Sequence, residues 1–425
     1  MTLARASSRW LPHSCALLSF ASSMAMGAAR GPDDFAVSDM AVYVERALMA
    51  AAGTYPRDAA FQSQGEVLLI LGAHTWLGGA ARVAWIHAAV AAVAASVVPR
   101  TAARLGLGAR GQALTGLVAA TWFPTAMYTQ LYLGESVAAS LTLIAAATWL
   151  DAFVGRAGSG VSGSSPADVA SVGPPWHQAV AGLALGLACV FRPNLQLTVV
   201  LAVAWIGCAG RRHHAAFFTG GATIGLAFAY GVTRALIPDG HGLAENGGFN
   251  FYMSVAPIRQ LASTSAGGGW APIVNAALYS EAVTTDVPLT DSGYFYAEAW
   301  RLVTAHPGAA LVRWGTNLWC SAGAVMTFPG FEGDAGDTLL SVCAVASAVA
   351  AVVGAVGAAY RGTSAQRALV LAAITSSVIT CALFMGTPRA RYPFDVIFLL
   401  CGAAQVSRLF RRRVPTGSDS ARRGG

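Results

Sequence analysis

Ten long apolar stretches, separated by short polar or glycine- and proline-containing breaks, run through the 425-residue chain. A helix needs about 20 apolar residues to cross the ~30 Å hydrocarbon layer of a membrane, and most of these stretches approach that length. The pattern therefore predicts an all-α polytopic membrane protein with about ten transmembrane helices. The predicted spans are 10–29, 80–98, 112–128, 136–154, 178–191, 195–209, 215–236, 338–360, 368–386 and 393–407.

Composition supports a membrane protein and excludes a soluble one. Hydrophobic residues make up 55% of the chain and charged residues only 11%, whereas ordinary soluble domains carry about 25% charged residues. A nucleic-acid-binding function is excluded for the same reason, despite the formal charge of +7. The seven cysteines show no paired spacing, so neither a disulfide framework nor a zinc site is expected.

The distribution of charge predicts the orientation. If the N-terminus is cytoplasmic, alternation of the ten spans places most of the 27 basic residues inside, and all of these are arginines. Most acidic residues then face out. The expected location is a bacterial inner membrane, with the active site on the outer face, where the two longest loops lie.

Three regions follow from this topology. Residues 1–236 form an N-terminal transmembrane module whose first outer loop, 30–79, is the expected catalytic loop. Residues 237–337 form a large outer loop with interfacial helices, and residues 338–425 form the C-terminal transmembrane helices and a basic cytoplasmic tail.

Three apolar segments leave room for other topologies. Segments 66–79 and 309–327 are short or interrupted by Arg313, so they are expected to be interfacial helices on the outer face. The first span, 10–29, also resembles a cleavable signal peptide, since arginines precede it and small residues end it. Cleavage there would leave the remaining topology unchanged.

The first outer loop contains a candidate catalytic acid. In SDMAVYVERAL, Asp39, Tyr43 and Arg46 fall near one face of a helix that Ser38 can cap. An ionised carboxylate at the start of that helix would be held close to the membrane surface. The alternative is that Asp39 only caps the helix.

A second acid lies at the outer entrance of the fourth span. Glu135, in LGESVAASL, directly precedes the predicted span 136–154. A carboxylate beside the bilayer is costly unless it is solvated or paired, so Glu135 is a functional candidate. The alternative is an ordinary carboxylate at a helix start.

Two groups of arginines oppose the orientation rule. Arg192 lies in VFRPNLQL, in a tight outer turn before Pro193, and Arg389, Arg391 and Tyr392 lie in PRARYPFDVIF before the last span. Outward guanidinium groups need anions, and phosphate accepts two parallel hydrogen bonds from such a group. The alternatives are contact with bulk lipid phosphates and pairing with an outer acid.

Together these segments resemble the GT-C superfamily of membrane glycosyltransferases, which includes protein mannosyltransferases and bacterial lipid-glycan transferases. The resemblance covers nearly the whole chain, in order. The matching segments are SDMAVYVERAL, LGES, VFRPNLQL, GGFNFYMSV with Asn250 and Tyr252, the segment 291–319, and PRARYPFDVIFLL. The chain lacks the DxD-like acid pair of some relatives, which leaves the use of a divalent metal open.

The resemblance implies inverting transfer of a sugar, a hexose such as mannose, from a polyprenyl-phosphate donor to a glycan, lipid or protein acceptor. It assigns the general base to Asp39 and assigns phosphate binding to three arginines, Arg192, Arg389 and Arg391. Glu135 would orient the acceptor, bind a metal or pair with an arginine. Sugar or headgroup contacts are implied for Tyr43, Asn250, Tyr252 and Tyr392.

Other functions remain open at this stage. A ligase-like enzyme of lipid-linked glycans also presents a large outer loop to its substrate. A lipid or solute transporter would place ionisable residues at the centres of its spans, whereas Asp151 and Asp395 lie near span ends. A non-catalytic scaffold is the remaining alternative.

Overall fold

The computed structural model of the protein describes residues 2–29, 39–153, 173–208, 211–256, 287–324, 335–384, 386 and 388–411. Every regular element in these ranges is a helix, as the hydrophobic pattern predicts. The principal helices are α1 (Thr2–Ala29), α2 (Asp39–Ala51), α3 (Gly65–Leu77), α4 (Val83–Arg104), α5 (Ala109–Ala120), α6 (Phe123–Tyr128), α7 (Glu135–Phe153), α8 (Trp176–Ala188), α9 (Gln196–Cys208), α10 (Arg212–Leu236), α11 (Gly247–Val255), α13 (Ser292–Ala305), α14 (Pro307–Trp319), α15 (Ala335–Arg361), α16 (Ser364–Leu383), α17 (Pro388–Arg391) and α18 (Asp395–Arg411).

Five of the described helical segments are long and apolar enough to cross a membrane. They are Ala80–Arg104, Glu135–Phe153, Arg212–Leu236, Thr338–Tyr360 and Ala365–Leu383. The protein is thus an all-α, multi-pass membrane protein, which confirms the predicted fold class. The count of ten spans stays a prediction, because helices such as the 13-residue α8 are too short to cross alone.

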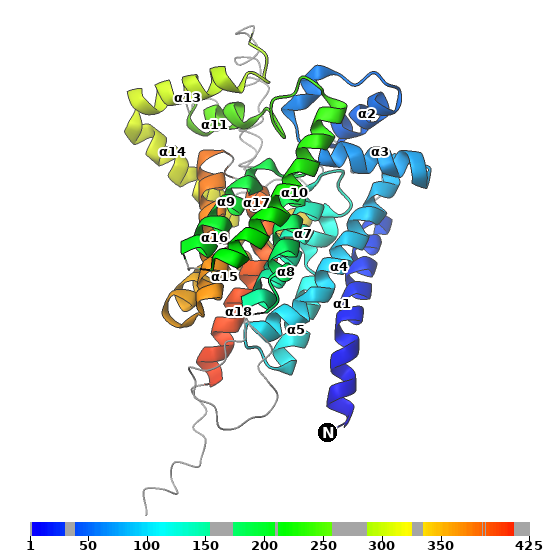
Figure 1. The fold of residues 1–425 in the computed structure, drawn as a ribbon, viewed down its shortest axis with the longest axis vertical. Coiled ribbons are helices and arrows are strands. Elements are labelled where there is room, and N and C mark those ends of the chain that lie inside the picture. Colours follow the sequence, from blue (N-terminus) through cyan, green and yellow to red (C-terminus); the bar gives the residue numbers. More distant parts are fainter. Residues whose placement is uncertain are drawn as a thin grey trace, which may run out of the picture.

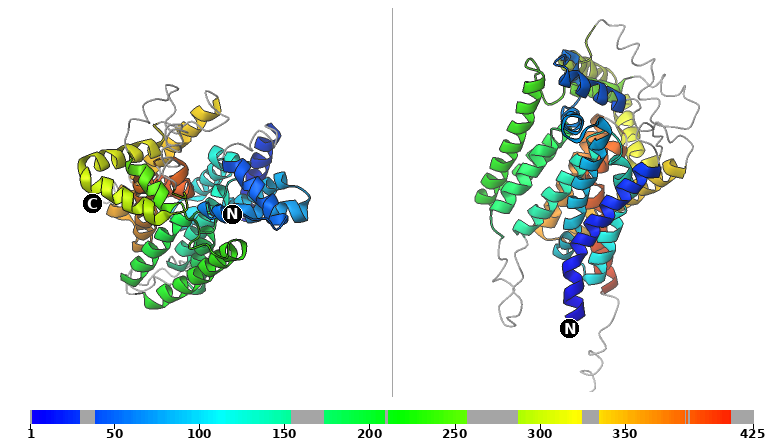
Figure 2. Two further views of the ribbon diagram at one scale, coloured as in Figure 1. Left: turned by 90° about the horizontal axis from the view of Figure 1, so that it is seen from above. Right: turned by 90° about the vertical axis from the view of Figure 1, so that its right-hand side faces the viewer.

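The helices form one elongated bundle (Figure 1). The N-terminus lies at one end, and α2, α3, α11, α13 and α14 gather at the other, called the capped end below (Figures 1 and 2). Helix α1 runs along the bundle and packs against α4 and α5, where Cys15 lies against Gly116. The capped end corresponds to the two long loops that the sequence places outside.

Some helices match the segments predicted from the sequence, and one predicted segment was wrong. The expected interfacial helices 66–79 and 309–327 correspond to α3 and to α14 with the π-helical turn Cys320–Ala324 that follows it. The expected single span 112–128 is instead two helices, α5 and α6. The break falls at Trp122, whose backbone is extended, and Pro124 lies in the first turn of α6.

Helices α8 and α10 meet through glycines. A β-carbon on Gly221 would lie 2.0 Å from the carbonyl oxygen of Ala179, and one on Gly182 would lie 2.1 Å from that of Phe218. One helical turn further along, β-carbons on Gly186 and Gly225 would also meet backbone oxygens, at 2.6 and 2.7 Å. Small residues allow this close backbone approach, which is how helices commonly associate within membranes.

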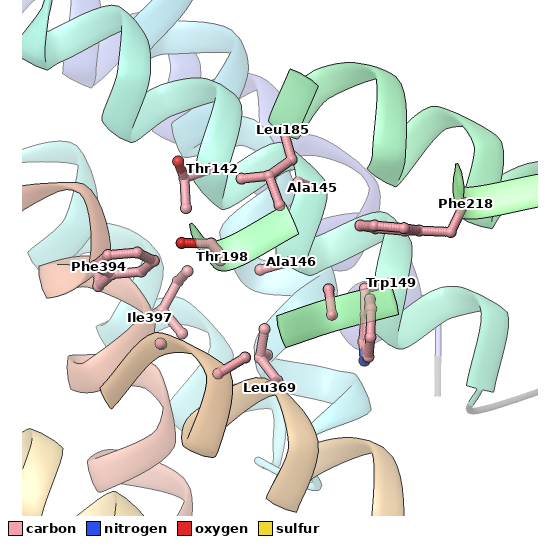
Figure 3. Close-up of a pocket in the computed structure, with 13 residues that line it drawn as sticks. Thr142, Ala145, Ala146, Trp149, Leu185, Thr198, Phe218, Leu369, Phe394 and Ile397 are labelled. Carbon is pink, nitrogen blue, oxygen red and sulfur yellow. The ribbon is translucent and has the colours of Figure 1, made fainter. Parts of the chain in front are cut away.

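An apolar cavity of about 40 Å³ lies inside the bundle, between α7, α8, α9, α16 and α18 (Figure 3). Two threonines line it, but both hydroxyl groups are bonded elsewhere. The Thr142 hydroxyl donates to the Ala138 carbonyl at 2.7 Å, and that of Thr198 donates to Ser376 Oγ at 2.9 Å. The cavity is therefore lined by apolar surface.

The close contact between α8 and α10 predicts that an alanine at Gly221 destabilises the fold, whereas an alanine at Gly220 does not. Gly221→Ala adds a methyl group where backbone already lies, so we expect it to lower the free energy of unfolding by about 1–3 kcal/mol. Gly220→Ala is the matched control, because a β-carbon at that position would have nothing within 4 Å. Thermal unfolding in detergent measures both, and equal stability of the two variants would contradict the contact.

Candidate functional site

A buried cluster of one carboxylate and two guanidinium groups forms at the capped end of the bundle. Glu135, the first residue of α7, is 1% exposed. Its Oε1 accepts a hydrogen bond from Arg192 Nη1 at 3.1 Å and another from Arg389 Nε. Arg192 Nη2 also donates to the Arg389 carbonyl at 3.0 Å. The structure therefore brings three of the sequence-predicted residues into direct contact.

The local backbone explains why these side chains meet. Arg192 has an extended conformation (φ −136°, ψ 88°), which suits a residue before proline, and Pro193 starts a 3₁₀ turn there. The preceding Phe191 lies against Gly134, where a β-carbon would be 3.0 Å from its side chain. The turn before α7 and the turn after α8 thus touch, and Arg192 faces Glu135.

The cluster brings several hydrogen-bond donors together. Two guanidinium groups face one carboxylate. The buried Nε of Arg192 has no hydrogen-bond partner. A buried donor without a partner is unfavourable, so the cluster is suited to receive an anionic oxygen.

Arg391 has a different environment from Arg389. Its Nε donates to Asp395 Oδ1 at 3.0 Å, and its Nη2 donates to the Ala344 carbonyl at 2.7 Å. Ser347 on α15 donates to the same Asp395 oxygen at 2.8 Å. Arg391 therefore joins α15 to the start of α18 and is not a member of the Glu135 cluster.

Three tyrosines pack together close to the cluster. Two of them, Tyr43 and Tyr392, were predicted as contacts from the sequence, and the third is Tyr128. Tyr392 donates to Thr125 Oγ1 at 3.1 Å, and its ring lies 4.4 Å from that of Tyr128. Tyr43 on α2 belongs to the same buried group. Helix α2 begins at Asp39, one turn before Tyr43. The side chain of Asp39 lies outside the described residues.

Asn250 and Tyr252 lie apart from Glu135. Both are on α11, which packs against α13, and the Tyr252 ring lies 5.8 Å from that of Phe295. The structure thus places both residues in the cap, on a helix that packs against α13 and α14.

A buried histidine–glutamate pair, which the sequence pattern does not predict, lies beside the cluster. His87 Nε2 lies 3.2 Å from Glu66 Oε2, and His87 Nδ1 lies 3.3 Å from the Thr129 carbonyl oxygen. Both side chains are at most 1% exposed. The carbonyl can only accept, so Nδ1 carries a hydrogen, and Nε2 faces the Glu66 carboxylate. A lone histidine within an apolar helix was the signal available in the sequence.

A second missed contact joins the two long loops. Arg57 forms two hydrogen bonds to the Glu245 carboxylate, at 2.9 and 3.0 Å. The Glu245 backbone N–H donates to the Ala60 carbonyl at 2.7 Å, and the Ser292 hydroxyl donates to the Glu245 carbonyl at 2.6 Å. This loop clasp, formed by Arg57, Glu245, Ala60 and Ser292, fixes the first loop to the start of α13.

The described residues do not fit a metal ion at the cluster. The charged groups that contact Glu135 are two guanidinium groups, which repel a cation and use the carboxylate oxygen that a metal would need. Within the described part of the chain, no group of three or more histidine, cysteine, aspartate or glutamate side chains could hold a metal.

Structural comparison identifies the fold. No family model and no curated protein sequence matches the chain. The archaeal oligosaccharyltransferase AglB from Archaeoglobus fulgidus, solved with an inhibitory peptide and a dolichol-phosphate, is similar over 95% of this chain, with a TM-score of 0.51 and 14% identity. The chain has the GT-C fold.

The predicted resemblance to GT-C proteins is thus confirmed at the level of the fold. The chain spans about half of AglB, covering 51% of its length. ArnT from Cupriavidus metallidurans, solved with undecaprenyl phosphate, is also similar, with a TM-score of 0.38 and 17% identity over 95% of this chain and 78% of ArnT.

The loop clasp predicts a pH-dependent stability. Burial raises the pKa of Glu245, but hydrogen bonds from Arg57 and from the His241 backbone outweigh burial and hold that pKa below its ordinary value of 4.5. The clasp therefore stabilises the fold above this ordinary value, and the stability is lost as the pH falls through the lowered pKa. Because Arg57 is 43% exposed, we expect at most about 1 kcal/mol.

Unfolding midpoints measured between pH 7 and pH 3 test this expectation. Glu245→Gln should lower the midpoint at pH 7 and remove part of the pH dependence that the wild type shows. Glu45→Gln, at an exposed position on α2, is the control and should keep that dependence. An unchanged pH profile in Glu245→Gln would show that the clasp contributes nothing.

Proposed function

We propose that the protein is a membrane glycosyltransferase that moves a sugar from a polyprenyl-phosphate donor to an acceptor at the capped end. In this proposal the capped end is the outer face of the membrane. The observation that carries the proposal is the Glu135 cluster within a GT-C fold. There, two arginines meet at one buried carboxylate and the buried Arg192 Nε has no hydrogen-bond partner among the described residues.

The guanidinium groups favour a phosphate-linked donor. A sugar linked to a lipid through phosphate presents anionic phosphate oxygens. These oxygens suit the guanidinium groups of Arg192 and Arg389 and the buried Arg192 Nε, which has no hydrogen-bond partner among the described residues.

The proposed reaction assigns the base to Asp39. Its carboxylate removes the proton of the acceptor hydroxyl, and the acceptor oxygen attacks the anomeric carbon. The bond from that carbon to the phosphate oxygen breaks on the opposite face, so the configuration inverts. The bonding electrons leave with the lipid phosphate, whose charge rises from one to two.

Arg192 and Arg389 stabilise that developing charge. Their positions are fixed before the reaction by the shared carboxylate and by the bond from Arg192 to the Arg389 carbonyl. Donors that are already oriented in a partly water-excluded site stabilise a transition state without reorganising. Glu135 acts in this scheme by orienting the two arginines, and Tyr43 and Tyr392 pack beside them.

Activity measurements test the base. Asp39→Asn keeps the size of the side chain and its ability to accept a hydrogen bond but cannot take the proton, so we expect at least about a 10²-fold loss of sugar transfer. Undecaprenyl phosphate carrying radiolabelled mannose is the first donor to assay in membranes that contain the protein. Asp58→Asn, at an exposed acid of the same loop, should retain activity. Full transfer by Asp39→Asn would remove the base assignment.

Binding measurements test the arginines without knowledge of the sugar. Arg389→Met removes one of the two guanidinium groups, so we expect the affinity for undecaprenyl phosphate to fall by about tenfold or more. Arg389→Lys keeps the charge but not the planar donors and should bind with intermediate affinity. Arg234→Met, at an exposed arginine of α10, is the matched control. Equal affinities of all four proteins would contradict the proposed phosphate site.

A further inference from the structure

Two arginines of the described chain are more than nine-tenths buried, and only one of them has a counter-ion. Arg391 is 5% exposed and pairs with Asp395 at 3.0 Å. Arg313 is 7% exposed, and within the described residues no carboxylate lies within 4 Å of it. The contrast singles out Arg313, because a buried charge is normally paired.

The surroundings of Arg313 satisfy only part of its guanidinium group. Arg313 lies in the middle of α14, where its Nη2 donates to the Ala256 carbonyl at the end of α11. Its Nε is buried and has no hydrogen-bond partner. The Nε donor of this buried cation is thus unused. The next residue, Trp314, also bonds to α11, since its Nε1 donates to Ser254 Oγ at 3.4 Å.

Burial acts against the charged form of this side chain. Desolvation lowers the pKa of the Arg313 guanidinium, and among the described residues no carboxylate opposes this effect. An arginine nevertheless stays protonated at neutral pH, so the described surroundings leave its positive charge uncompensated. An anion with two adjacent oxygens would satisfy both the charge and the planar donors of the guanidinium group.

The neighbouring surface indicates where such an anion would come from. Helix α14 exposes Leu311, Val312 and Trp319, and the adjoining α13 exposes Trp300. Tryptophan beside aliphatic residues is typical of the interface between membrane and water, where lipid phosphates are the abundant anions. Figure 1 places α14 across the capped end from α2 and α3.

We propose that Arg313 is a binding site for a phosphate group of an anionic lipid, separate from the Glu135 cluster. The guanidinium group donates to two phosphate oxygens, and Nε becomes one of the two donors. Different elements form this site, namely α11 and α14, so it does not depend on the function proposed for Glu135, Arg192 and Arg389.

Thermal unfolding of the full chain in a neutral detergent tests the site. The probes are short-chain phosphatidylglycerol and, separately, inorganic phosphate, each compared with chloride at equal ionic strength. A ligand that binds only the folded state raises the melting temperature, so we expect phosphatidylglycerol to raise that of the wild type. A rise with phosphatidylglycerol alone identifies a lipid headgroup, and a rise with both probes identifies any phosphate.

Arg313→Met should lose this response. We also expect the variant, without ligand, to melt at or above the wild-type temperature, because it lacks the uncompensated buried charge. Arg301→Met is the matched control, since Arg301 is an exposed arginine of the neighbouring α13 and pairs with Glu298. It removes the same charge and should keep the response.

A second variant covers the case in which Arg313→Met does not fold. Arg313→Lys keeps the charge but cannot present two coplanar donors, so its response to phosphatidylglycerol should be clearly smaller than that of the wild type. The proposal is overturned if the wild type shows no response, or if the Arg313 variant that folds responds as strongly as Arg301→Met.

Discussion

The pairing of Glu135 with Arg192 and Arg389 is the interaction on which the capped end depends. It joins the start of α7, the turn after α8 and helix α17, so three segments distant in sequence meet at one carboxylate. Removing the carboxylate takes away the acceptor that both guanidinium groups share, which is strongly unfavourable in a buried group. The same pairing fixes the two guanidinium groups beside each other. In the proposed function, stability and phosphate binding therefore depend on the same three side chains.

Much of the fold follows from the apolar pattern, because a membrane allows few alternatives to helices with fully bonded backbones. The pattern identified α4, α7, α10, α15 and α16, whose apolar stretches approach 20 residues. It failed where the chain breaks locally, as at Trp122 between α5 and α6. It also failed to identify α11 and α13, because the amphipathic helices of a cap give a weaker signal than a span.

The site was predictable in part. Arginines that oppose the orientation rule marked Arg192 and Arg389, and an acid at a helix entrance marked Glu135. The same rule could not separate Arg389 from Arg391, because two residues along a helix turn the side chain to a different side. Glu66 and His87, like Arg57 and Glu245, meet only through tertiary packing, so no spacing in the sequence reveals them.

The number of residues between the two partners of each ion pair has a consequence for biosynthesis. Arg391 and Asp395 are four residues apart, so this ion pair can form as soon as the first turn of α18 has been made. Glu135 leaves the ribosome 57 residues before Arg192 and 254 residues before Arg389. The carboxylate therefore lies at the edge of the bilayer while most of the chain is still being translated. Its second guanidinium partner, Arg389, is made only with the last helices, so an incomplete chain lacks the complete cluster.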